Sequence, residues 1–238
     1  MTTGGEPTAT DEVKTAFAYP RVMGAEATVR TTSARRVSPA REEKYRAEKQ
    51  QIVRAAYELI QRDGSKETSV HDVLHAAGLS TRAFYRHFRS KDELVLEMYR
   101  VDCDRVNATV AAAVASASHP LAALEAWIDQ NLAVVYDARR LRHAVVLSSA
   151  EVASAEGFTD VKNAGLAAQR APLVALLRDG RTQGVFPRAD PETDALAIQA
   201  VVGAHMRARL DRDPAALTRA EARQRTLDLF QRALGAPT

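Results

Sequence analysis

The sequence predicts an all-α fold, in which a compact unit of three helices is followed by a larger helical body. Apolar residues recur at spacings of three and four, and the alternation typical of strands does not persist anywhere. Alanine and leucine are abundant, whereas aromatic residues make up 5% of the chain. Helix start and stop signals also follow one another closely between residues 63 and 94.

The composition is that of a globular protein with enough residues to form a core. Of the 238 residues, 46% are hydrophobic and 26% are charged. Cys103 is the one cysteine, which excludes an internal disulfide and a cysteine-based metal cluster. The N-terminus lacks the basic and apolar regions of a signal peptide, and no apolar run approaches the ~18 residues of a membrane helix. We therefore expect a soluble cytoplasmic protein without a membrane partner.

Residues 1–40 show no steady period and are predicted to form a flexible arm. Arg30, Arg35 and Arg36 could follow a phosphate backbone or enter a minor groove; the alternative is a solvated tail. Positive charge is concentrated after the arm. Residues 41–91 carry 11 Lys and Arg against 7 Asp and Glu, whereas residues 92–238 carry 17 against 19. Such a local excess suits a polyanion-binding surface, although a solvated face can look the same.

The three-helix unit is predicted from its boundaries. A helix over residues 44–63 carries an apolar stripe and ends at Gly64. Ser69 and Asp72 form a capping-box pattern for a second helix, 70–77, which ends at Gly78. A short third helix runs from Ser80 to about Phe88. This order of helix, tight glycine turn and short polar helix is the helix-turn-helix pattern.

The remaining segments are also predicted to be helical. Ser90 and Glu93 open a long one that ends near Ser116, and Pro120 begins the next. Further helices are expected over residues 139–153, 158–183, 191–211 and 214–234. The last two are predicted from Asp190-Pro191 and Asp213-Pro214, which combine an N-cap with proline at the first helical position. Pro172 lies inside the 158–183 segment, where proline costs about 3 kcal/mol, so we expect a kink or a break there.

The segment GLSTRAFYRHFRSKDEL, residues 78–94, contains the side chains with the most distinctive chemistry. Gly78 permits the left-handed backbone of a tight turn. Phe84 and Phe88 lie four residues apart and are expected to face the interior. Thr81, Arg82, Tyr85 and Arg86 or His87 then point outward. Hydroxyl, guanidinium and imidazole donors on a short helix suit a DNA major groove.

Individual roles follow from position on this short helix. Thr81 and Arg82, in its first turn, would meet base edges, and arginine can bond both acceptors of guanine. Tyr85 and His87 are better placed for phosphates; the alternative for each ring is packing on a neighbouring helix. Lys91 begins the following helix, where backbone amides already favour an anion.

Residues 68–94, TSVHDVLHAAGLSTRAFYRHFRSKDEL, resemble the DNA-binding domain of the tetracycline-repressor (TetR) family of transcription regulators. The AGLS turn, the aromatic pair of FYRHF and the lysine three residues beyond it carry the resemblance, which covers residues 44–105. The run GVFPRADPE, residues 184–192, resembles the link between the last two dimer helices of that family. The resemblance implies a helix-turn-helix from Ser69 to Phe88 and a ligand-binding and dimerisation domain over residues 106–238. It further implies DNA contacts from Thr68, Ser69, Ser80, Thr81, Arg82, Ala83, Tyr85, Arg86, His87 and Lys91.

The body offers candidates for a small-molecule pocket. In the family, large side chains often line such a pocket, although core packing alone would explain each of them here. His205 and Arg207 could reach a ligand carboxylate or a partner subunit. The expected pocket residues are Trp127, Tyr136, Phe158, His205 and Met206. His71 and His75 lack a third ligand at zinc-like spacing, so we expect neither a metal nor a cofactor.

The leading hypothesis is a repressor that a small molecule releases from a palindromic operator. We expect a homodimer formed by residues 158–183 and 191–211, on account of their apolar positions Leu173, Leu176, Leu177, Leu196, Ile198, Val201 and Val202. The alternative is a non-specific, architectural DNA-binding protein, which would lack the ~10³-fold preference of a regulator for its operator. An enzyme is disfavoured because the sequence offers no nucleophile–base pair, phosphate loop or metal cluster.

Overall fold

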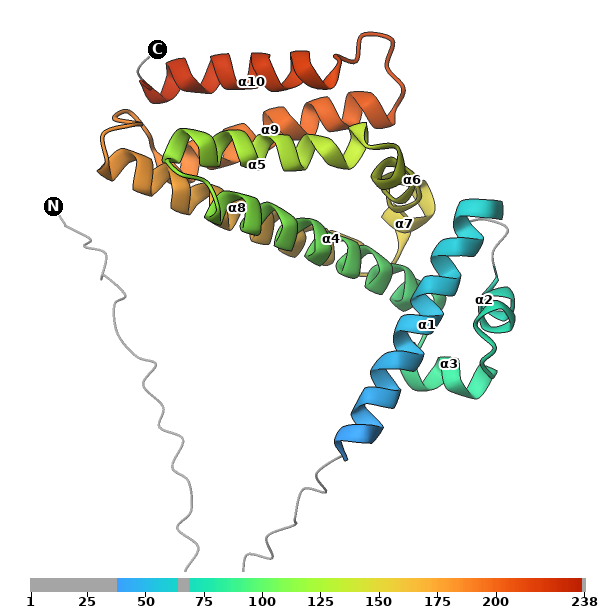
Figure 1. The fold of residues 1–238 in the computed structure, drawn as a ribbon. Coiled ribbons are helices and arrows are strands. Elements are labelled where there is room, and N and C mark those ends of the chain that lie inside the picture. Colours follow the sequence, from blue (N-terminus) through green and yellow to red (C-terminus); the bar gives the residue numbers. More distant parts are fainter. Residues whose placement is uncertain (1–37, 64–68, 237–238) are drawn as a thin grey trace, which may run out of the picture. The chain divides into compact units, whose positions relative to one another are not determined.

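Every regular element in the described part of the chain is a helix, as the sequence predicts (Figure 1). The computed structural model describes residues 38–63 and 69–236. The expectations for the arm up to residue 37 and for Thr68 therefore fall outside the described residues. Within these residues, none of the helices is both long enough and apolar enough to cross a membrane.

The first three helices form the head. They are α1 (Pro39–Asp63), α2 (Val70–Ala77) and α3 (Thr81–His87), and α4 (Lys91–Ala115) follows. The predicted capping box is present at α2, where the Ser69 hydroxyl accepts from the Asp72 amide and the Asp72 carboxylate accepts from the Ser69 amide. The head core is formed by Ile52, Val53, Ala55, Ala56, Leu59, Ile60, Val73, Leu74, Ala77, Phe84, Phe88, Leu94, Met98 and Leu147.

Helix α4 leads from the head into the body (Figure 1) and contributes buried residues to both cores. Leu94 and Met98, in its first half, are buried in the head core, whereas Val110 is fully buried in the body core. The helix continues without interruption across residues 105 and 106, where the sequence suggested a domain boundary.

Helix α5 (Pro120–Tyr136) is central to the body. It packs against α4, α8 (Phe158–Thr182), α9 (Pro191–Leu210) and α10 (Arg219–Leu234). Its Leu124, Trp127, Ile128 and Leu132 side chains are all fully buried. Two short helices, α6 (Ala138–Leu147) and α7 (Ala150–Ser154), connect α5 to α8.

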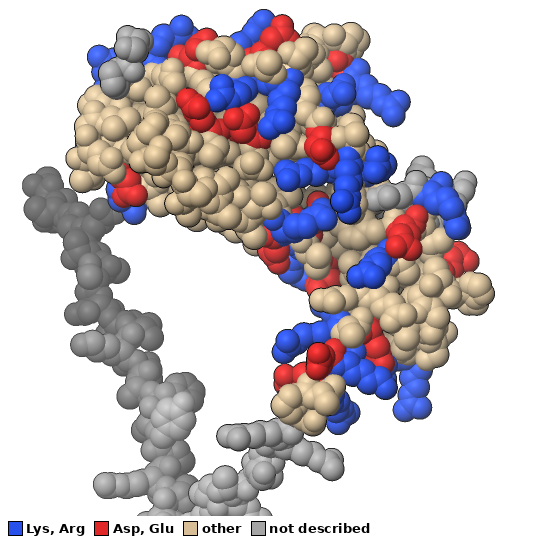
Figure 2. All heavy atoms as spheres, viewed as in Figure 1, with Lys and Arg blue, Asp and Glu red and all other residues tan. Residues whose placement is uncertain are grey.

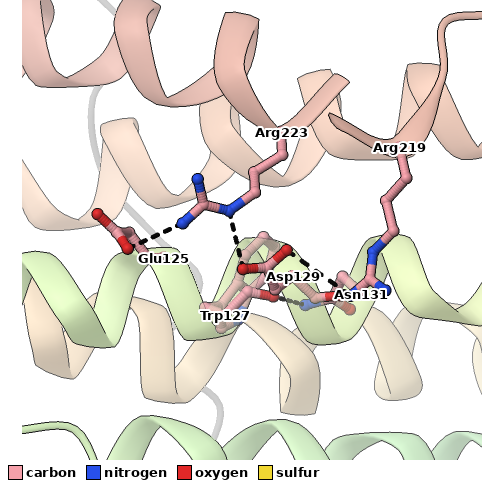
Figure 3. Close-up of polar contacts among 6 residues, drawn as sticks. All are labelled: Glu125, Trp127, Asp129, Asn131, Arg219 and Arg223. Atoms are coloured by element: carbon pink, nitrogen blue, oxygen red, sulfur yellow. Dashed lines mark hydrogen bonds and ion pairs between the residues drawn. The ribbon is translucent and has the colours of Figure 1, made fainter. Parts of the chain in front are cut away.

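Helix α10 is held against α5 by charged side chains (Figure 3), and its apolar residues pack in the body core. The Arg223 guanidinium donates from Nε to Asp129 and from Nη2 to Glu125, both at 2.9 Å. Arg219 donates to the Asp129 backbone carbonyl at 3.2 Å. Because Arg223 engages two carboxylates one helical turn apart, it fixes α10 along the α5 axis.

Three helix boundaries differ from expectation, whereas α8 keeps its expected span and runs through Pro172 without a break. Ala168, whose carbonyl loses its helical partner at Pro172, is exposed. α1 begins at Pro39 instead of Lys44. The segment 139–153 is divided into α6 and α7 because Ser149 starts a new helix by capping the Val152 amide. α10 begins at Arg219 instead of Pro214, because Thr218 and Glu221 provide a complete capping box.

The apolar residues that suggested a dimer interface are mostly core residues of this chain. Leu173, Leu176, Leu177, Ile198 and Val202 are at most 5% exposed and pack within the body core. In contrast, Leu196 is 57% exposed and Val201 is half-buried. The apolar periodicity of α8 and α9 therefore marks mainly the faces they turn inward.

We predict that Gly78→Ala lowers the free energy of unfolding by about 1–2 kcal/mol, the cost of the left-handed conformation for a residue with a Cβ. Gly78 has φ 63°, and a Cβ there would meet no atom within 4 Å, so backbone strain acts alone. Gly78→Asn is the matched control, because asparagine tolerates this conformation better. Urea denaturation of both variants measures the difference, and equal losses would contradict the assignment of the cost to the backbone.

Candidate nucleic-acid interface

The turn before α3 fixes where this helix begins. Gly78 ends α2 in a left-handed conformation and donates its amide to the His75 carbonyl at 3.1 Å. Two residues later, the Ser80 hydroxyl accepts from the Ala83 amide at 3.3 Å and caps the N-terminus of α3. A glycine C-cap and a serine N-cap separated by a single residue give the sharp change of direction that a helix-turn-helix requires.

The inner side of α3 is apolar, as predicted. Phe84 and Phe88 are each 1% exposed, and their ring centroids lie 5.6 Å apart. Leu79, at the turn, packs against the same core. Ala83 is also buried, so its methyl group does not lie on the outer face, contrary to the sequence-based assignment of a DNA contact to this residue.

The outer side of α3 carries the donors expected from the sequence. Thr81 and Arg82 are exposed in the first turn. Tyr85 is 63% exposed, with its ring edge-on to Phe84 at 5.4 Å. Thr81, Arg82 and Tyr85 therefore form a surface of hydroxyl and guanidinium donors on a helix that is anchored from beneath. We call these three residues the outer face of α3.

His87 does not face outward, which corrects the expectation that it contacts a phosphate. Its side chain is fully buried, with Nε2 3.1 Å from Oε2 of Glu48 on α1. The imidazole lies against the Tyr45 ring, with centroids 4.2 Å apart. Of the two alternatives for this ring, packing on a neighbouring helix is the one observed.

Arg86 is partly exposed but has a partner in α1. Its guanidinium forms a hydrogen-bonded ion pair with Glu48, and its backbone carbonyl accepts from the Tyr45 hydroxyl at 3.3 Å. The hydrogen bond from His87, followed by the charge of Arg86, lowers the pKa of the Glu48 carboxyl, although desolvation opposes the shift. Glu48 therefore stays ionised and holds the C-terminal end of α3 against α1.

Tyr45 and Glu48 were not identified from the sequence as supports of α3. They lie three residues apart on α1, which places them on one side of that helix. This spacing was the available signal, but it does not tell which distant helix the pair meets. The neighbouring Lys49 also reaches the head core, 5.7 Å from the centre of the Phe88 ring.

Two helix N-termini accompany the outer face of α3. Ser69 caps α2 and is exposed, and Lys91 is the first residue of α4 and is half-buried. Free amide groups and the helix dipole favour anions at such ends. His71 and His75 are exposed on α2, and no group of three potential metal ligands occurs among the residues that the structure describes.

The body contains a cavity of about 250 Å³, which we call the inner cavity. Of the five expected pocket residues, Trp127 and Met206 line it. Tyr136 instead donates its hydroxyl to the Leu217 carbonyl at 2.6 Å, and Phe158 packs edge-on against Tyr99. His205 does not line the cavity either; burial, and then the charge of Arg225, lower its pKa.

Several residues of the inner cavity were missed because no local pattern marks them. Cys103 and Asn107 from α4 and Gln169 from α8 meet there with Gln199 from α9. Burial raises the pKa of the Cys103 thiol to about 11, so the thiol is protonated at neutral pH. The sequence alone does not show that these three helices meet at one cavity.

Sequence comparisons with known proteins find similarity in the head. A family model described as "Bacterial regulatory proteins, tetR family" matches residues 52–98. The HTH-type transcriptional regulator TcmR of Streptomyces glaucescens is 38% identical over 56 residues, which are 24% of this chain and 25% of that protein. The matched segment thus spans a quarter of the curated relative.

Solved structures match most of the chain. A transcriptional regulator from Rhodococcus sp. Rha1 is 25% identical, with a TM-score of 0.61 over 80% of this chain and 98% of the other. A TetR transcription regulator from Haloarcula marismortui ATCC 43049 is 17% identical, with a TM-score of 0.65 over 80% of this chain and 97% of the other. Head and body therefore follow the fold of these regulators.

We predict that Glu48→Gln makes the protein less stable at pH 7, and that the difference shrinks in acid. The pKa of Glu48 is lowered on folding. The ionised carboxylate therefore stabilises the fold at pH values above the ordinary glutamate pKa of about 4.3. This stabilisation is lost as the pH falls through the folded-state pKa. Urea midpoints measured between neutral and acidic pH test this. Glu58→Gln, exposed on the same helix, serves as the control. A difference that does not depend on pH would contradict the prediction.

Proposed function

Because its helix-turn-helix head belongs to the tetR family of bacterial regulatory proteins, we propose that this chain is a transcriptional repressor that a small molecule releases from operator DNA. One observation carries the proposal: the outer face of α3 presents hydroxyl and guanidinium donors, while Phe84 and Phe88 hold the helix from beneath. A short helix presented in this way can enter a major groove.

We assign direct base contacts to Thr81 and Arg82 in the first turn of α3. This is the end that a recognition helix brings to the base edges. Tyr85, one turn further on, would donate to a phosphate, as would the N-termini of α2 at Ser69 and of α4 at Lys91. Arg86 and His87 would act indirectly, because their contacts with Glu48 set the orientation of α3.

The proposed dimer would form through the outer faces of α8 and α9. These faces carry small side chains, which let helices approach closely, together with two exposed leucines: Leu166 is 37% exposed and Leu196 57%. The exposed small residues are Ala164, Ala167, Ala168, Ala171 and Ala175 on α8 and Ala197, Ala200, Gly203 and Ala204 on α9. A two-fold dimer would present two copies of α3 to successive major grooves, so the operator should be close to palindromic.

The small molecule would occupy the inner cavity. Trp127, Met206 and Leu147 give this cavity an apolar wall inside the helical body. A ligand that binds one spacing of the two heads better than another shifts the dimer towards that spacing. Release from the operator then follows without any contact between ligand and DNA.

We predict that Arg82→Ala weakens operator binding by about 1–3 kcal/mol and relaxes the choice of base at one position. Lys91→Ala should weaken all sequences alike and reduce the slope of log K against log salt by about 1. The operator is first selected from random DNA, and affinities are then measured at several salt concentrations.

Arg232→Ala, exposed in the last turn of α10, is the control for loss of positive charge far from α3. Unchanged operator affinity in both the Arg82 and the Lys91 variants would refute the assignment. A preference for the operator below ~10³-fold over random DNA would favour the architectural alternative.

We predict that Ala200→Glu weakens the dimer by about 100-fold or more, because an unpaired carboxylate buried in an interface costs about 3 kcal/mol. Ala200 lies in the middle of the exposed small-residue face of α9. Ala108→Glu, exposed in the middle of α4, is the matched control. Sedimentation equilibrium measures both, and equal dissociation constants would contradict the proposed interface.

A further inference from the structure

The inner cavity has a mainly apolar lining, to which Asp102 and Arg207 also contribute, and its amide side chains already have partners. The Gln199 amide donates to the Leu166 carbonyl at 2.9 Å and to the Gln169 side chain at 2.7 Å. Asn107 donates to the Gly165 carbonyl at 3.2 Å. Because these groups are bonded within the protein, the cavity does not require a polar ligand to satisfy them. The apolar part of the lining can therefore hold the hydrocarbon portion of a ligand.

A second cavity, of about 260 Å³, adjoins the inner one; we call it the arginine vestibule. Asp102, Val106 and Val134 line both cavities, so the two share a wall. The remaining residues of the vestibule are Arg105 and Thr109 from α4 and Arg139, Arg140 and His143 from α6. In the space-filling view, basic side chains gather over α6 (Figure 2).

The charges of the vestibule do not balance. Arg105 is paired with Asp102, whose carboxylate also lies 3.8 Å from Nδ1 of His143. Across residues 38–63 and 69–236, neither the Arg139 nor the Arg140 guanidinium forms an ion pair. Asp137 lies nearby, but its carboxylate accepts from the backbone amides of both residues and caps α6. Two guanidinium groups thus remain for an anion.

The surroundings of His143 reflect the same excess of positive charge. Burial lowers the pKa of this imidazole, and the charges of Arg105 and Arg139 lower it further, against the opposing effect of Asp102. The neutral ring therefore adds no further cation to the vestibule near neutral pH, and the arginines supply its positive charge. Arginine forks bind carboxylates and phosphates through paired hydrogen bonds.

We infer that the two cavities form one site for an amphiphilic anion, with its short apolar portion in the inner cavity and a carboxylate or phosphate head at Arg139 and Arg140. Each cavity alone is below the ~300–1,000 Å³ of ordinary ligand sites, whereas a ligand that spans both falls within that range. This inference rests on the proposed function, since it names the class of the small molecule, but it is tested without DNA.

Trp127 is the one tryptophan of the chain, and it lines the inner cavity, so its fluorescence reports on occupancy. The probes are octanoate, octyl phosphate, 1-octanol, octyltrimethylammonium and inorganic phosphate, each titrated below its micelle concentration. We expect at least one octyl anion to bind about 10-fold or more tighter than 1-octanol, the effect of one charge-assisted contact. The preferred anion shows whether the natural head is a carboxylate or a phosphate.

The double variant Arg139→Gln and Arg140→Gln should lose that 10-fold preference while binding 1-octanol as before, which also shows that the inner cavity is intact. Arg142→Gln is the matched control, because Arg142 lies on the same helix, is exposed and does not line the vestibule. It should change octyl phosphate affinity by less than about 2-fold, as expected for a distant surface charge.

Three outcomes would overturn the inference. They are binding of both octyl anions no tighter than 1-octanol, tighter binding of octyltrimethylammonium, and inorganic phosphate binding as tightly as octyl phosphate. Operator binding is measured separately with the same protein. Loss of the anion preference with intact operator binding overturns the ligand class alone, whereas absence of operator binding with intact anion preference overturns the proposed function alone.

Discussion

The orientation of α3 depends on the burial of Phe84 and Phe88 in the head core. This helix has seven residues, and a helix of that length is not stable by itself in water. Each buried phenylalanine contributes about 1.5–3 kcal/mol relative to an exposed one. Glu48 adds a polar fastening at the C-terminal end through Arg86 and His87. Because these contacts hold the inner side of α3, Thr81, Arg82 and Tyr85 remain exposed and are available for binding.

Some residues contact both the head and the body, so a structural change in one of these parts affects the packing of the other. Leu147 from α6 is buried in the head core and also lines the inner cavity. Tyr57 from α1 donates its hydroxyl to the Met98 carbonyl of α4 at 2.8 Å, and its ring lies 4.8 Å from that of His143. A ligand that displaces α6 would therefore move side chains on which α1 rests. Packed cores resist gradual deformation, so such a displacement favours discrete arrangements of the head.

The features that the sequence predicts well are those decided within a few residues. Gly78, Ser80 and the Ser69–Asp72 box are local, and each is observed with the expected geometry. The inward position of Phe84 and Phe88 follows from helical spacing together with their size. In these cases no distant part of the chain competes with the local preference.

The features that the sequence misses depend on which helix lies opposite. His87 and Tyr85 have similar chemistry, but α1 covers His87 and leaves Tyr85 exposed. Leu173 and Leu177 were assigned to a partner subunit, whereas both are fully buried in the body core of the same chain. Apolar periodicity indicates that a face is buried without telling what buries it. For the same reason the vestibule cannot be predicted from the sequence, since Arg105 and Arg140 come from different helices.

Arginine is placed at both proposed sites, and its surroundings decide what each can bind. Arg82 projects from an exposed helix, where a groove wide enough for the helix can bring base edges and phosphates to it. Arg139 and Arg140 border a recess that adjoins an apolar cavity, which is far too small for a duplex. A small amphiphilic anion gains little binding energy at α3, because no apolar cavity among the described residues adjoins Arg82 to hold its hydrocarbon portion. DNA gains little binding energy at the vestibule, because its bases cannot enter. The two ligands therefore do not compete for one surface, and any effect of one on the other must pass through the helices between them.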